Sequence, residues 1–271
     1  MSEMRDRPSD QPYRLDARQA DVRHLPPALP LALIDRLATL LSDDERRRAA
    51  GFQAMALRQR FITMHGALRL LLSAYTECPA DQLEFRLGVW GKPELVENPS
   101  NLRFSVTYAA TGGAIAITRQ ASVGVDVEMT QWSDDWPALA RRCFAPHELR
   151  GLESYLRAGD RTNAARMFAR TWAGKEAVLK AIGLGLVDGL AGLETPEEGR
   201  GLMTMGAAPI ELTEDLACRA EWCKEWWLEP LHCDSRSVGA IAVPGSDWKV
   251  VERVLDPREL VDLCDSRLAA C

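Results

Sequence analysis

Two five-residue segments of nearly the same sequence, GAIAI at residues 113–117 and GAIAV at residues 239–243, lie far apart in the chain. Each follows a strand-like run and a short turn, and each lies downstream of a long helical pattern, at residues 57–75 and 163–182. This arrangement predicts an α+β fold of two pseudo-symmetric α/β halves that join near residue 120, with the active site in a cleft between them. Five residues also match by chance, so two similar but unrelated buried strands are the alternative.

The composition is that of an ordinary globular protein. The 271 residues are 46% hydrophobic and 27% charged with a formal net charge of −6, which excludes a chain built to wrap nucleic acid. The polar N-terminal segment lacks a signal-peptide core, and no window is long and apolar enough for a membrane helix. Seven scattered cysteines without a C-x-x-C pair predict reduced thiols. We expect a cytoplasmic protein that binds no nucleic acid and no membrane.

The pattern along the chain predicts four parts. They are a disordered arm at residues 1–20, an N-terminal half at 21–120, a C-terminal half with a metal site at 121–250, and a C-terminal helix and tail at 251–271. The predicted helices cover residues 31–41, a segment that begins at the capping box of residues 42–45, and residues 57–75, 136–143, 146–158, 163–182 and 257–270. The predicted strands cover residues 83–87, 102–108, 113–118, 122–128, 210–212, 218–223, 226–233 and 238–243.

The predicted strand at residues 122–128 carries two carboxylates on one face. Side chains alternate along a strand, so Asp126 and Glu128 point the same way while Val125 and Val127 enter the core. Two carboxylates about 6–7 Å apart on one face suit a hard divalent cation such as Mg²⁺. A solvated strand end is the alternative, because exposed carboxylates are common.

The predicted helix at residues 163–182 carries a second charged group. Glu176 and Lys180 are four residues apart and share one face, with Lys175 beside them. An ordinary surface ion pair would have the same spacing. The neighbours favour the floor of a pocket, because Trp172 precedes the pair and the glycine-punctuated sequence GLGL follows it at residues 183–186.

A third segment, Gly91-Lys92-Pro93, predicts a rigid turn that presents a lysine. A lysine in such a turn can contact a phosphate. Most loop lysines are merely solvated, so this segment alone indicates little.

Together these segments resemble the 4′-phosphopantetheinyl transferases of the larger, monomeric Sfp type. Residues 91–93 look like the family's GKP loop, and residues 124–128 like its G-[VI]-D-[VI]-E strand. Residues 144–148 are similar to its F-[SA]-x-x-E helix start. Residues 172–180 fit W-[ST]-x-KEA-x-x-K, with Ala173 in place of the usual small hydroxyl residue. The resemblance spans about residues 22–245 and includes an R-x-x-x…LR pattern at Arg60 and Leu68-Arg69.

The resemblance implies a reaction. The family transfers the phosphopantetheine arm of coenzyme A to a serine of an apo carrier protein and releases 3′,5′-ADP, with Mg²⁺ (or Mn²⁺) as cofactor. The expected partners are acyl or peptidyl carrier proteins, including the carrier domains of polyketide and nonribosomal peptide synthetases, and the protein is expected to be a monomer. Neither the carrier protein nor the fatty-acid, polyketide or peptide pathway follows from the sequence.

The resemblance also implies roles for particular residues. Asp126, Glu128 and Glu176 would hold the metal, and Glu176 and Lys180 would be catalytic, Glu176 as the general base. The residues expected to bind coenzyme A are Arg60, Lys92, Pro93, Thr107, Tyr108, Asp126, Lys175 and Lys180. Further candidates are Arg58 and Arg69 for phosphates, and Arg141 and Arg142 for the rim that meets the carrier protein, although a solvated helix face is the alternative for the last two.

One position departs from the family pattern. The family's F-N-x-S-H-S strand places a histidine at the 3′-phosphate of coenzyme A, whereas residues 104–109 here read FSVTYA. Tyr108 and Thr107 can donate hydrogen bonds but bring no positive charge, and a charged hydrogen bond is about twice as strong as a neutral one. We therefore expect weaker binding of the 3′-phosphate unless Arg58, Arg60 or Lys92 compensates.

Two alternatives remain at this point. A coenzyme A-binding relic without catalytic activity is motivated by Tyr108. A magnesium nuclease would also use clustered carboxylates with a lysine, but the order of Asp126, Glu128 and the later Lys175-Glu176 fits that class poorly.

Overall fold

The computed structural model describes residues 13–88, 90–131, 135–184, 190–196, 199–205 and 225–268. The predicted strands at residues 210–212 and 218–223 lie outside these ranges, as does part of the GLGL segment. The helices are α1 (Leu31–Thr39), α2 (Asp43–Ala50), α3 (Met55–Thr76), α4 (Trp136–Cys143), α5 (Pro146–Arg157), α6 (Arg161–Ile182), the 3₁₀ turn η1 (Leu190–Gly192) and α8 (Pro257–Leu268). The strands are β1 (Gln19–Leu25), β2 (Phe85–Leu87), β3 (Pro93–Leu95), β4 (Leu102–Ala109), β5 (Gly112–Arg119), β6 (Gly124–Met129), β7 (Leu193–Glu194), β8 (Gly201–Met205), β9 (Glu225–Leu231), β10 (Ser237–Pro244) and β11 (Lys249–Val254).

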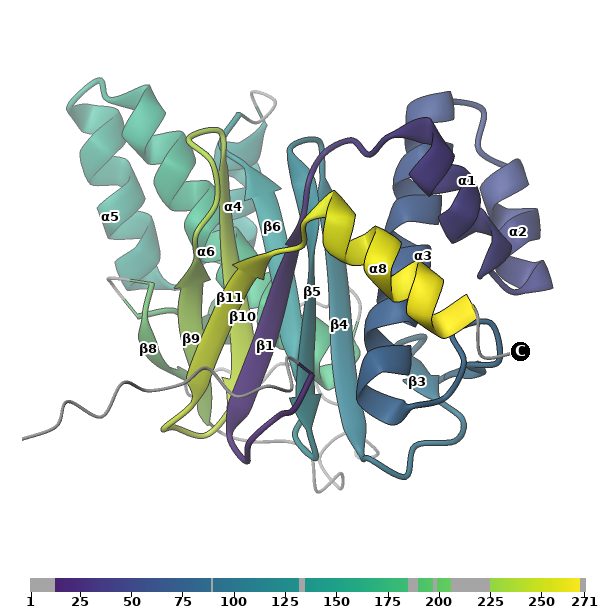
Figure 1. Cartoon of the computed structure of the whole chain (residues 1–271). Coiled ribbons are helices and arrows are strands. Elements are labelled where there is room, and N and C mark those ends of the chain that lie inside the picture. Colours follow the sequence, from purple (N-terminus) through teal and green to yellow (C-terminus); the bar gives the residue numbers. More distant parts are fainter. Residues whose placement is uncertain are drawn as a thin grey trace, which may run out of the picture.

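The mixed α+β class predicted from the sequence is confirmed. One sheet has the order β11-β1-β5-β4, and a second has the order β6-β10-β9-β8-β7, while β2 and β3 form a small hairpin. The two similar segments at residues 113–117 and 239–243, which we term the two copies of the echo, lie in β5 and β10. Each of these strands pairs with antiparallel strands on both sides. Helices α1, α2, α3 and α8 lie on one side of the strands and α4, α5 and α6 on the other (Figure 1).

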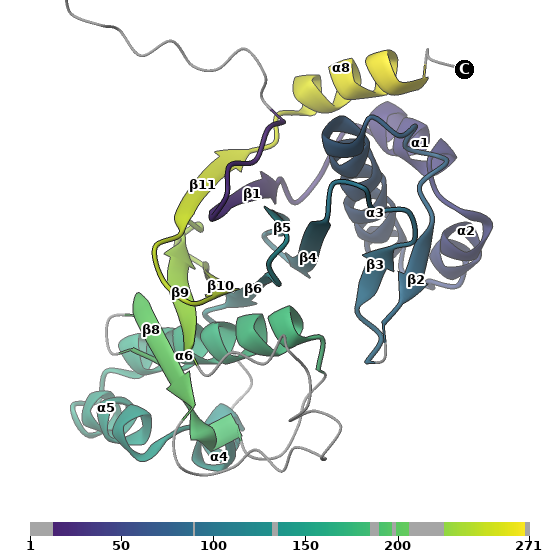
Figure 2. The same ribbon diagram turned by 90° about the horizontal axis from the view of Figure 1, so that it is seen from below.

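Three apolar clusters hold these layers together. One joins α1, α3 and α8 to β4 and β5, and a second joins α4, α5 and α6 to β9 and β10. The third contains small and β-branched side chains of β1, β5, β6 and β10, and so lies between the two sheets. The view from below shows α6 lying along β6 and β10, with α3 on the far side of β4 (Figure 2).

The two copies of the echo do not face equivalent surroundings. Ile115 and Ile117 in β5 face the helical cluster, whereas Ile241 and Val243 in β10 face the core between the sheets. A shift by an odd number of residues reverses the two faces of a strand. The matching letters therefore do not mark structurally equivalent positions, and a duplicated origin of the halves stays a prediction.

The predicted disordered arm at residues 1–20 overlaps a buried residue and the start of a strand. Leu15 is buried, and β1 begins at Gln19 and carries Asp21 and Arg23 into the interior. Arg23 Nε donates to Asp21 Oδ2 over 2.9 Å, and the Tyr75 hydroxyl of α3 donates to the same carboxylate. This strand was not predicted, because charged residues in a sequence indicate a solvent-exposed segment unless the partners that pair with them in the interior are known.

The end of the chain returns to the first half. Strand β11, which the sequence did not predict, pairs in parallel with β1, and α8 packs against α3 and α1. The predicted boundary at residue 250 therefore cuts through a strand that belongs to the first sheet. Strands β3, β7 and β8 were also not predicted, since each is short or lies in a polar, glycine-rich stretch.

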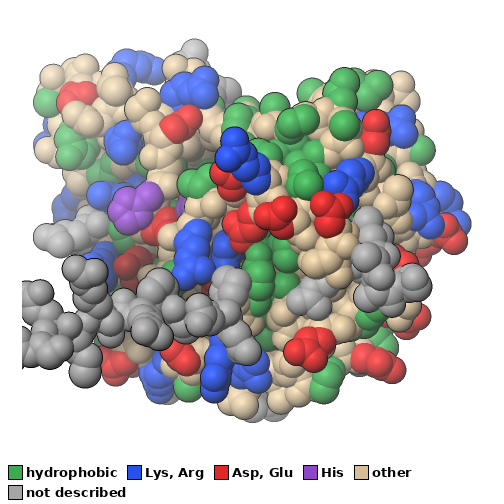
Figure 3. All heavy atoms as spheres, in the orientation of Figure 1, with side chains coloured by type: hydrophobic (Ala, Val, Ile, Leu, Met, Phe, Trp, Pro, Cys, Tyr) green, Lys and Arg blue, Asp and Glu red, His purple; other side chains and the backbone are tan. Residues whose placement is uncertain are grey.

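The described residues also show the state of the cysteines, the hydropathy of the helices and the charge on one face (Figure 3). Cys78, Cys143, Cys233 and Cys264 are free thiols. None of the described helices has the length and hydropathy needed to cross a bilayer. On the face seen in Figure 3, basic and acidic side chains are interspersed.

The capping box at the start of α2 extends into a buried network. Ser42 accepts from the amide of Glu45, and the Glu45 carboxylate accepts from the Ser42 amide. The same carboxylate pairs with His65 and with the buried Arg69, both on α3. Burial raises the pKa of Glu45, but hydrogen bonds from His65 and Ser42 and the charge of Arg69 outweigh it and lower the pKa to about 2.

We expect Glu45→Gln to lower the free energy of unfolding by about 3 kcal/mol at pH 7, because it leaves the buried Arg69 charge unpaired. The ionised carboxylate stabilises the fold above its unfolded pKa of 4.5 and loses this effect as the pH falls towards 2. Urea unfolding between pH 2.5 and 7 measures both effects. Glu153→Gln, at an exposed position on α5, is the control and should change stability by less than about 0.5 kcal/mol. An equal loss in both variants would contradict the prediction.

Candidate active site

Edge strands β4 and β6 of the two sheets meet beside α6, and the candidate site lies there. The amide of Val125 donates to Ser105 Oγ over 3.2 Å, and Thr107 Oγ1 donates to Asp126 Oδ1 over 3.1 Å. Since β4 and β6 belong to different sheets, these bonds join the two sheets at the candidate site. The predicted position of the active site between two related halves stays a prediction.

Helix α6 presents one row of side chains to β6. Trp172, Glu176 and Lys180 follow one another at intervals of four residues, about 6 Å along the helix axis. Asp126 and Glu128 are separated by a similar distance along the strand. Lys180 Nζ lies 2.6 Å from Asp126 Oδ1, and the Trp172 side chain donates a hydrogen bond to Glu128. The matched spacings explain why the strand and helix motifs occur together.

A glycine at the start of β6 permits this contact. A Cβ atom on Gly124 would lie 1.8 Å from the Ala177 carbonyl oxygen and 2.4 Å from the Ala181 nitrogen. Both atoms belong to the α6 backbone, which cannot move aside as a flexible side chain can. The sequence motif by itself indicates no role for Gly124. In the structure, this glycine lets the strand lie directly on the helix.

The carboxylates share an open pocket of about 540 Å³, which we term the acidic pocket. It is lined by Val106, Thr107, Tyr108, Ala109, Asp126, Val127, Glu128, Met129, Glu176 and Lys180. Burial and the charges of Asp126 and Glu176 raise the pKa of Glu128 to about 7. Burial and Asp126 also raise the pKa of Glu176, and the Lys180 charge opposes both shifts. The three carboxylates therefore repel one another, and the pocket favours a cation.

The side chains of the acidic pocket include the type of ligand atom that a magnesium ion prefers, the carboxylate oxygen. Asp126 is almost fully buried, and its Oδ2 atom has no hydrogen-bond partner within the described part of the chain. Hard cations take carboxylate oxygens of this kind as ligands. However, among the described residues no three His, Cys, Asp or Glu side chains are arranged so that they could already hold a metal ion. Asp126, Glu128 and Glu176 would have to converge to do so.

Lys175 does not line the acidic pocket, and its contact with coenzyme A stays a prediction. Its side chain is fully buried, and its ammonium lies 2.9 Å from Glu148 Oε2 and donates to the carbonyls of Leu190 and Leu193. Adjacent helical residues point about 100° apart, so Lys175 faces away when Glu176 faces β6. Burial lowers the pKa of the Lys175 ammonium, and Glu148 opposes this shift.

Glu148, at the start of α5, completes this internal network. It accepts from the amide of Ala145 and from the amide and hydroxyl of Thr195. The network fixes α5, α6 and residues 190–195 relative to one another. The F-x-x-x-E motif is therefore structural here, and the buried partner of its glutamate is the lysine of the helix motif.

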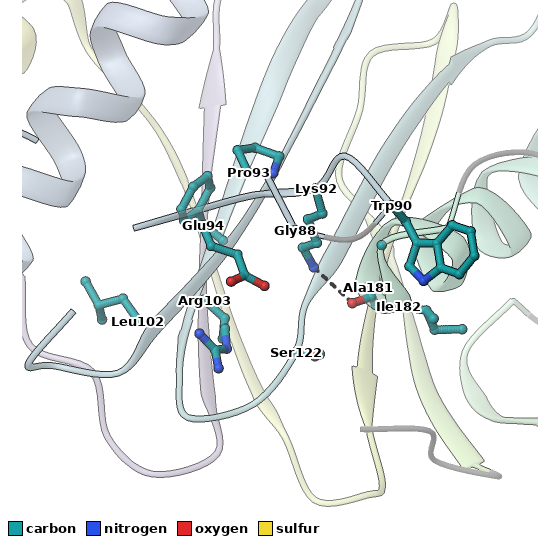
Figure 4. Close-up of a pocket in the computed structure, with 12 residues that line it drawn as sticks. Gly88, Trp90, Lys92, Pro93, Glu94, Leu102, Arg103, Ser122, Ala181 and Ile182 are labelled. Atoms are coloured by element: carbon teal, nitrogen blue, oxygen red, sulfur yellow. Dashed lines mark hydrogen bonds between the residues drawn. The ribbon is translucent and has the colours of Figure 1, made fainter. Parts of the chain in front are cut away.

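Lys92 of the GKP loop binds backbone carbonyls at both elements of the site. Its ammonium donates over 2.9 Å to the carbonyl of Val123, just before β6. It also donates over 2.9 Å to the carbonyl of Ala181, at the end of α6 (Figure 4). A lysine at this end of a helix satisfies carbonyls without intrahelical partners. Lys92 thus ties the GKP loop to both elements of the site, and its contact with coenzyme A stays a prediction.

The remaining predicted residues are spread over the site and its surroundings. Thr107 and the exposed Tyr108 line the acidic pocket, and Pro93 lines a neighbouring pocket with Trp90. Arg60 is half-buried on α3 and does not line the acidic pocket. Arg69 is buried and donates to Glu45 and to two carbonyls, so it has no access to a phosphate.

Comparisons with known proteins agree with this geometry. Residues 122–236 match the family model of the 4′-phosphopantetheinyl transferase superfamily. The 4′-phosphopantetheinyl transferase HetI of Nostoc sp. is 31% identical over 222 residues, which cover 81% of this chain and 85% of HetI. A putative 4′-phosphopantetheinyl transferase of Synechocystis sp. is 38% identical over 159 residues, which cover 58% of this chain and 63% of that protein. The mouse L-aminoadipate-semialdehyde dehydrogenase-phosphopantetheinyl transferase is 26% identical over 189 residues, which cover 66% of this chain and 59% of that protein.

The α+β fold, the paired strand and helix motifs and these similarities define the enzyme class as a phosphopantetheinyl transferase. The chain belongs to the 4′-phosphopantetheinyl transferase superfamily.

We expect Gly124→Ala to lower the free energy of unfolding by roughly 3 kcal/mol, because the added methyl group overpacks the contact between β6 and α6. Chemical unfolding followed by tryptophan fluorescence measures this loss. Gly51→Ala is the control, since Gly51 has helical backbone angles and only ordinary contacts, and it should change stability by less than about 1 kcal/mol. A Gly124→Ala protein as stable as the control would contradict the contact.

For the buried pair we expect Lys175→Met to cost about 3–5 kcal/mol, because it leaves the Glu148 charge without a cation. Adding Glu148→Gln to Lys175→Met should recover part of this loss, since the double variant buries no unpaired charge. Lys249→Met, at an exposed position in β11, is the control. If the losses of unfolding free energy in the single variants Lys175→Met and Glu148→Gln add up in the double variant, the two side chains do not interact.

Proposed function

We propose that this protein transfers 4′-phosphopantetheine from coenzyme A to a serine of an apo carrier protein, with Mg²⁺, and releases 3′,5′-ADP. The observation that carries the proposal is the gathering of Asp126, Glu128, Glu176 and Lys180 in one pocket between the sheets. Membership of the superfamily and the similarity to HetI support it.

The side chains of the acidic pocket would have different roles in the reaction. Asp126, Glu128 and Glu176 would hold the divalent cation, and one ligand atom would be Asp126 Oδ2, which has no hydrogen-bond partner among the described residues. A cation bound there neutralises the negative charge of the diphosphate. Glu176 would accept the proton of the carrier serine as that oxygen attacks the β-phosphorus, and Lys180 would donate to the oxygens of the leaving 3′,5′-ADP.

A second cavity suits the nucleotide end of coenzyme A. This cavity, which we term the tryptophan pocket, has a volume of about 210 Å³ and is lined mainly by Trp90, Pro93, Phe104, Val106 and Leu184. It shares Val106 and Lys180 with the acidic pocket. Apolar and aromatic walls suit a purine, and Lys180 at the junction suits the diphosphate. This division supports Pro93 as a coenzyme A contact.

The partner would be an acyl or peptidyl carrier protein or a carrier domain of a polyketide or nonribosomal peptide synthetase. The relatives' names attach them to phosphopantetheinyl transfer, and the mouse relative's name also includes L-aminoadipate-semialdehyde dehydrogenase. We further propose that the protein acts in the cytoplasm as a monomer.

The test is the mass of an apo carrier protein after incubation with the protein, coenzyme A and Mg²⁺. We expect a gain of one phosphopantetheine, and a loss of rate of at least about 100-fold in Asp126→Asn and Glu176→Gln, since each removes a carboxylate that would hold the cation and Glu176→Gln also removes the proposed base. Glu153→Gln should retain the parent rate. Coenzyme A binding without any modified carrier would contradict the catalytic proposal and favour the relic.

A further inference from the structure

Lys180 is the cation that the protein itself supplies to the acidic pocket. Its ammonium lies 2.6 Å from Asp126 Oδ1 and 3.2 Å from Thr107 Oγ1. The Lys180 side chain is 31% exposed, whereas that of Asp126 is 5% exposed. The carboxylate is thus fixed in the interior, while the lysine stem reaches it from the solvent side and can leave again.

The first sheet contains a similar aspartate with a different partner. Asp21 of β1 and Asp126 of β6 occupy similar positions in their strands. The residues on either side of each aspartate belong to the core between the sheets, so the aspartate side chain points to the other face of its strand. The charge of Asp21 is met by Arg23, which is 1% exposed and two residues along the same strand, and by the hydroxyl of Tyr75. At the corresponding place after Asp126, the strand carries Glu128 instead of an arginine. Asp126 therefore pairs with a partly exposed lysine of a helix, whereas Asp21 pairs with a buried arginine of its own strand.

The position of Lys180 affects any second cation in the pocket. A divalent ion bound by Asp126, Glu128 and Glu176 would lie close to the ammonium, and like charges at such distances repel each other strongly when partly buried. The pocket's carboxylates are not gathered as a metal site among the described residues, and the Lys180–Asp126 pair occupies one of them. Lys180 also lines the tryptophan pocket, so a diphosphate entering there would meet the same ammonium.

We propose, building on the function proposed above, that Lys180 competes with the divalent cation for Asp126 and that a diphosphate relieves this competition by drawing the ammonium away. Lys180 then links two binding events. The site binds Mg²⁺ weakly by itself, and coenzyme A strengthens this binding both by its own oxygens and by removing the competing charge.

The test measures Mg²⁺ binding by calorimetry in the full-length protein, without carrier protein and hence without turnover. We expect Lys180→Met to bind Mg²⁺ at least about fivefold more tightly than the parent in the absence of coenzyme A. Coenzyme A should then raise the Mg²⁺ affinity by a smaller factor in Lys180→Met than in the parent. Lys180→Arg, which keeps the charge, should bind Mg²⁺ as weakly as the parent, and Lys249→Met controls for loss of a lysine elsewhere.

A thermal measurement supplies an independent readout. In EDTA, Lys180→Met should melt below the parent, because the buried Asp126 loses its cation, and saturating Mg²⁺ should raise its melting temperature more than that of the parent. Equal Mg²⁺ affinities in the parent and Lys180→Met would overturn the competition while leaving the metal site intact. Failure of every variant to bind Mg²⁺, with or without coenzyme A, would overturn the metal site as well.

Discussion

The direct contact between β6 and α6 at Gly124 is the constraint on which the site depends. Without a side chain at this position, the strand backbone lies against the carbonyl of Ala177 and the amide of Ala181. Only at that separation can side chains of moderate length, such as Asp126 and Lys180, meet across the interface. Lys92 reinforces the contact by binding a carbonyl at the end of each element. The chemistry of the pocket therefore begins with a packing requirement of the backbone.

The protein treats buried charge in two opposite ways around one helix. On one face of α6, Lys175 and Glu148 form an internal pair whose remaining hydrogen bonds go to backbone groups, so the charges are balanced. On the other face, three carboxylates share one lysine, and burial together with the charges of Asp126 and Glu176 raises the pKa of Glu128 to about 7. The balanced face fixes the helix, and the unbalanced face attracts cations. A buried group without balance is costly and is typical of functional sites.

Local patterns predicted several parts of this structure. The periodicity of residues 57–75 and 163–182 predicted α3 and α6 to within a few residues, and the capping box predicted the start of α2. Alternation placed Asp126 and Glu128 on one face of a strand. Patterns of this kind failed for β1, whose Asp21 and Arg23 are charged but buried together, and for β11, whose partner strand lies at the other end of the sequence. The two similar segments at residues 113–117 and 239–243 match in sequence, but their large side chains face different surroundings, so the duplication stays a prediction.

The sequence by itself determined which residue types are available and which of them share a face, because both follow from the period of a strand or helix. It thereby fixed the carboxylate pair on β6 and the row of Trp172, Glu176 and Lys180 on α6. Only the tertiary structure decided which of the charged residues face the pocket and which are buried and paired in the interior. Lys175 and Arg69 lie in motifs that suggest phosphate binding, yet each is itself buried and bound to a glutamate and to carbonyls. Those partners come from distant segments, so no local pattern could reveal them.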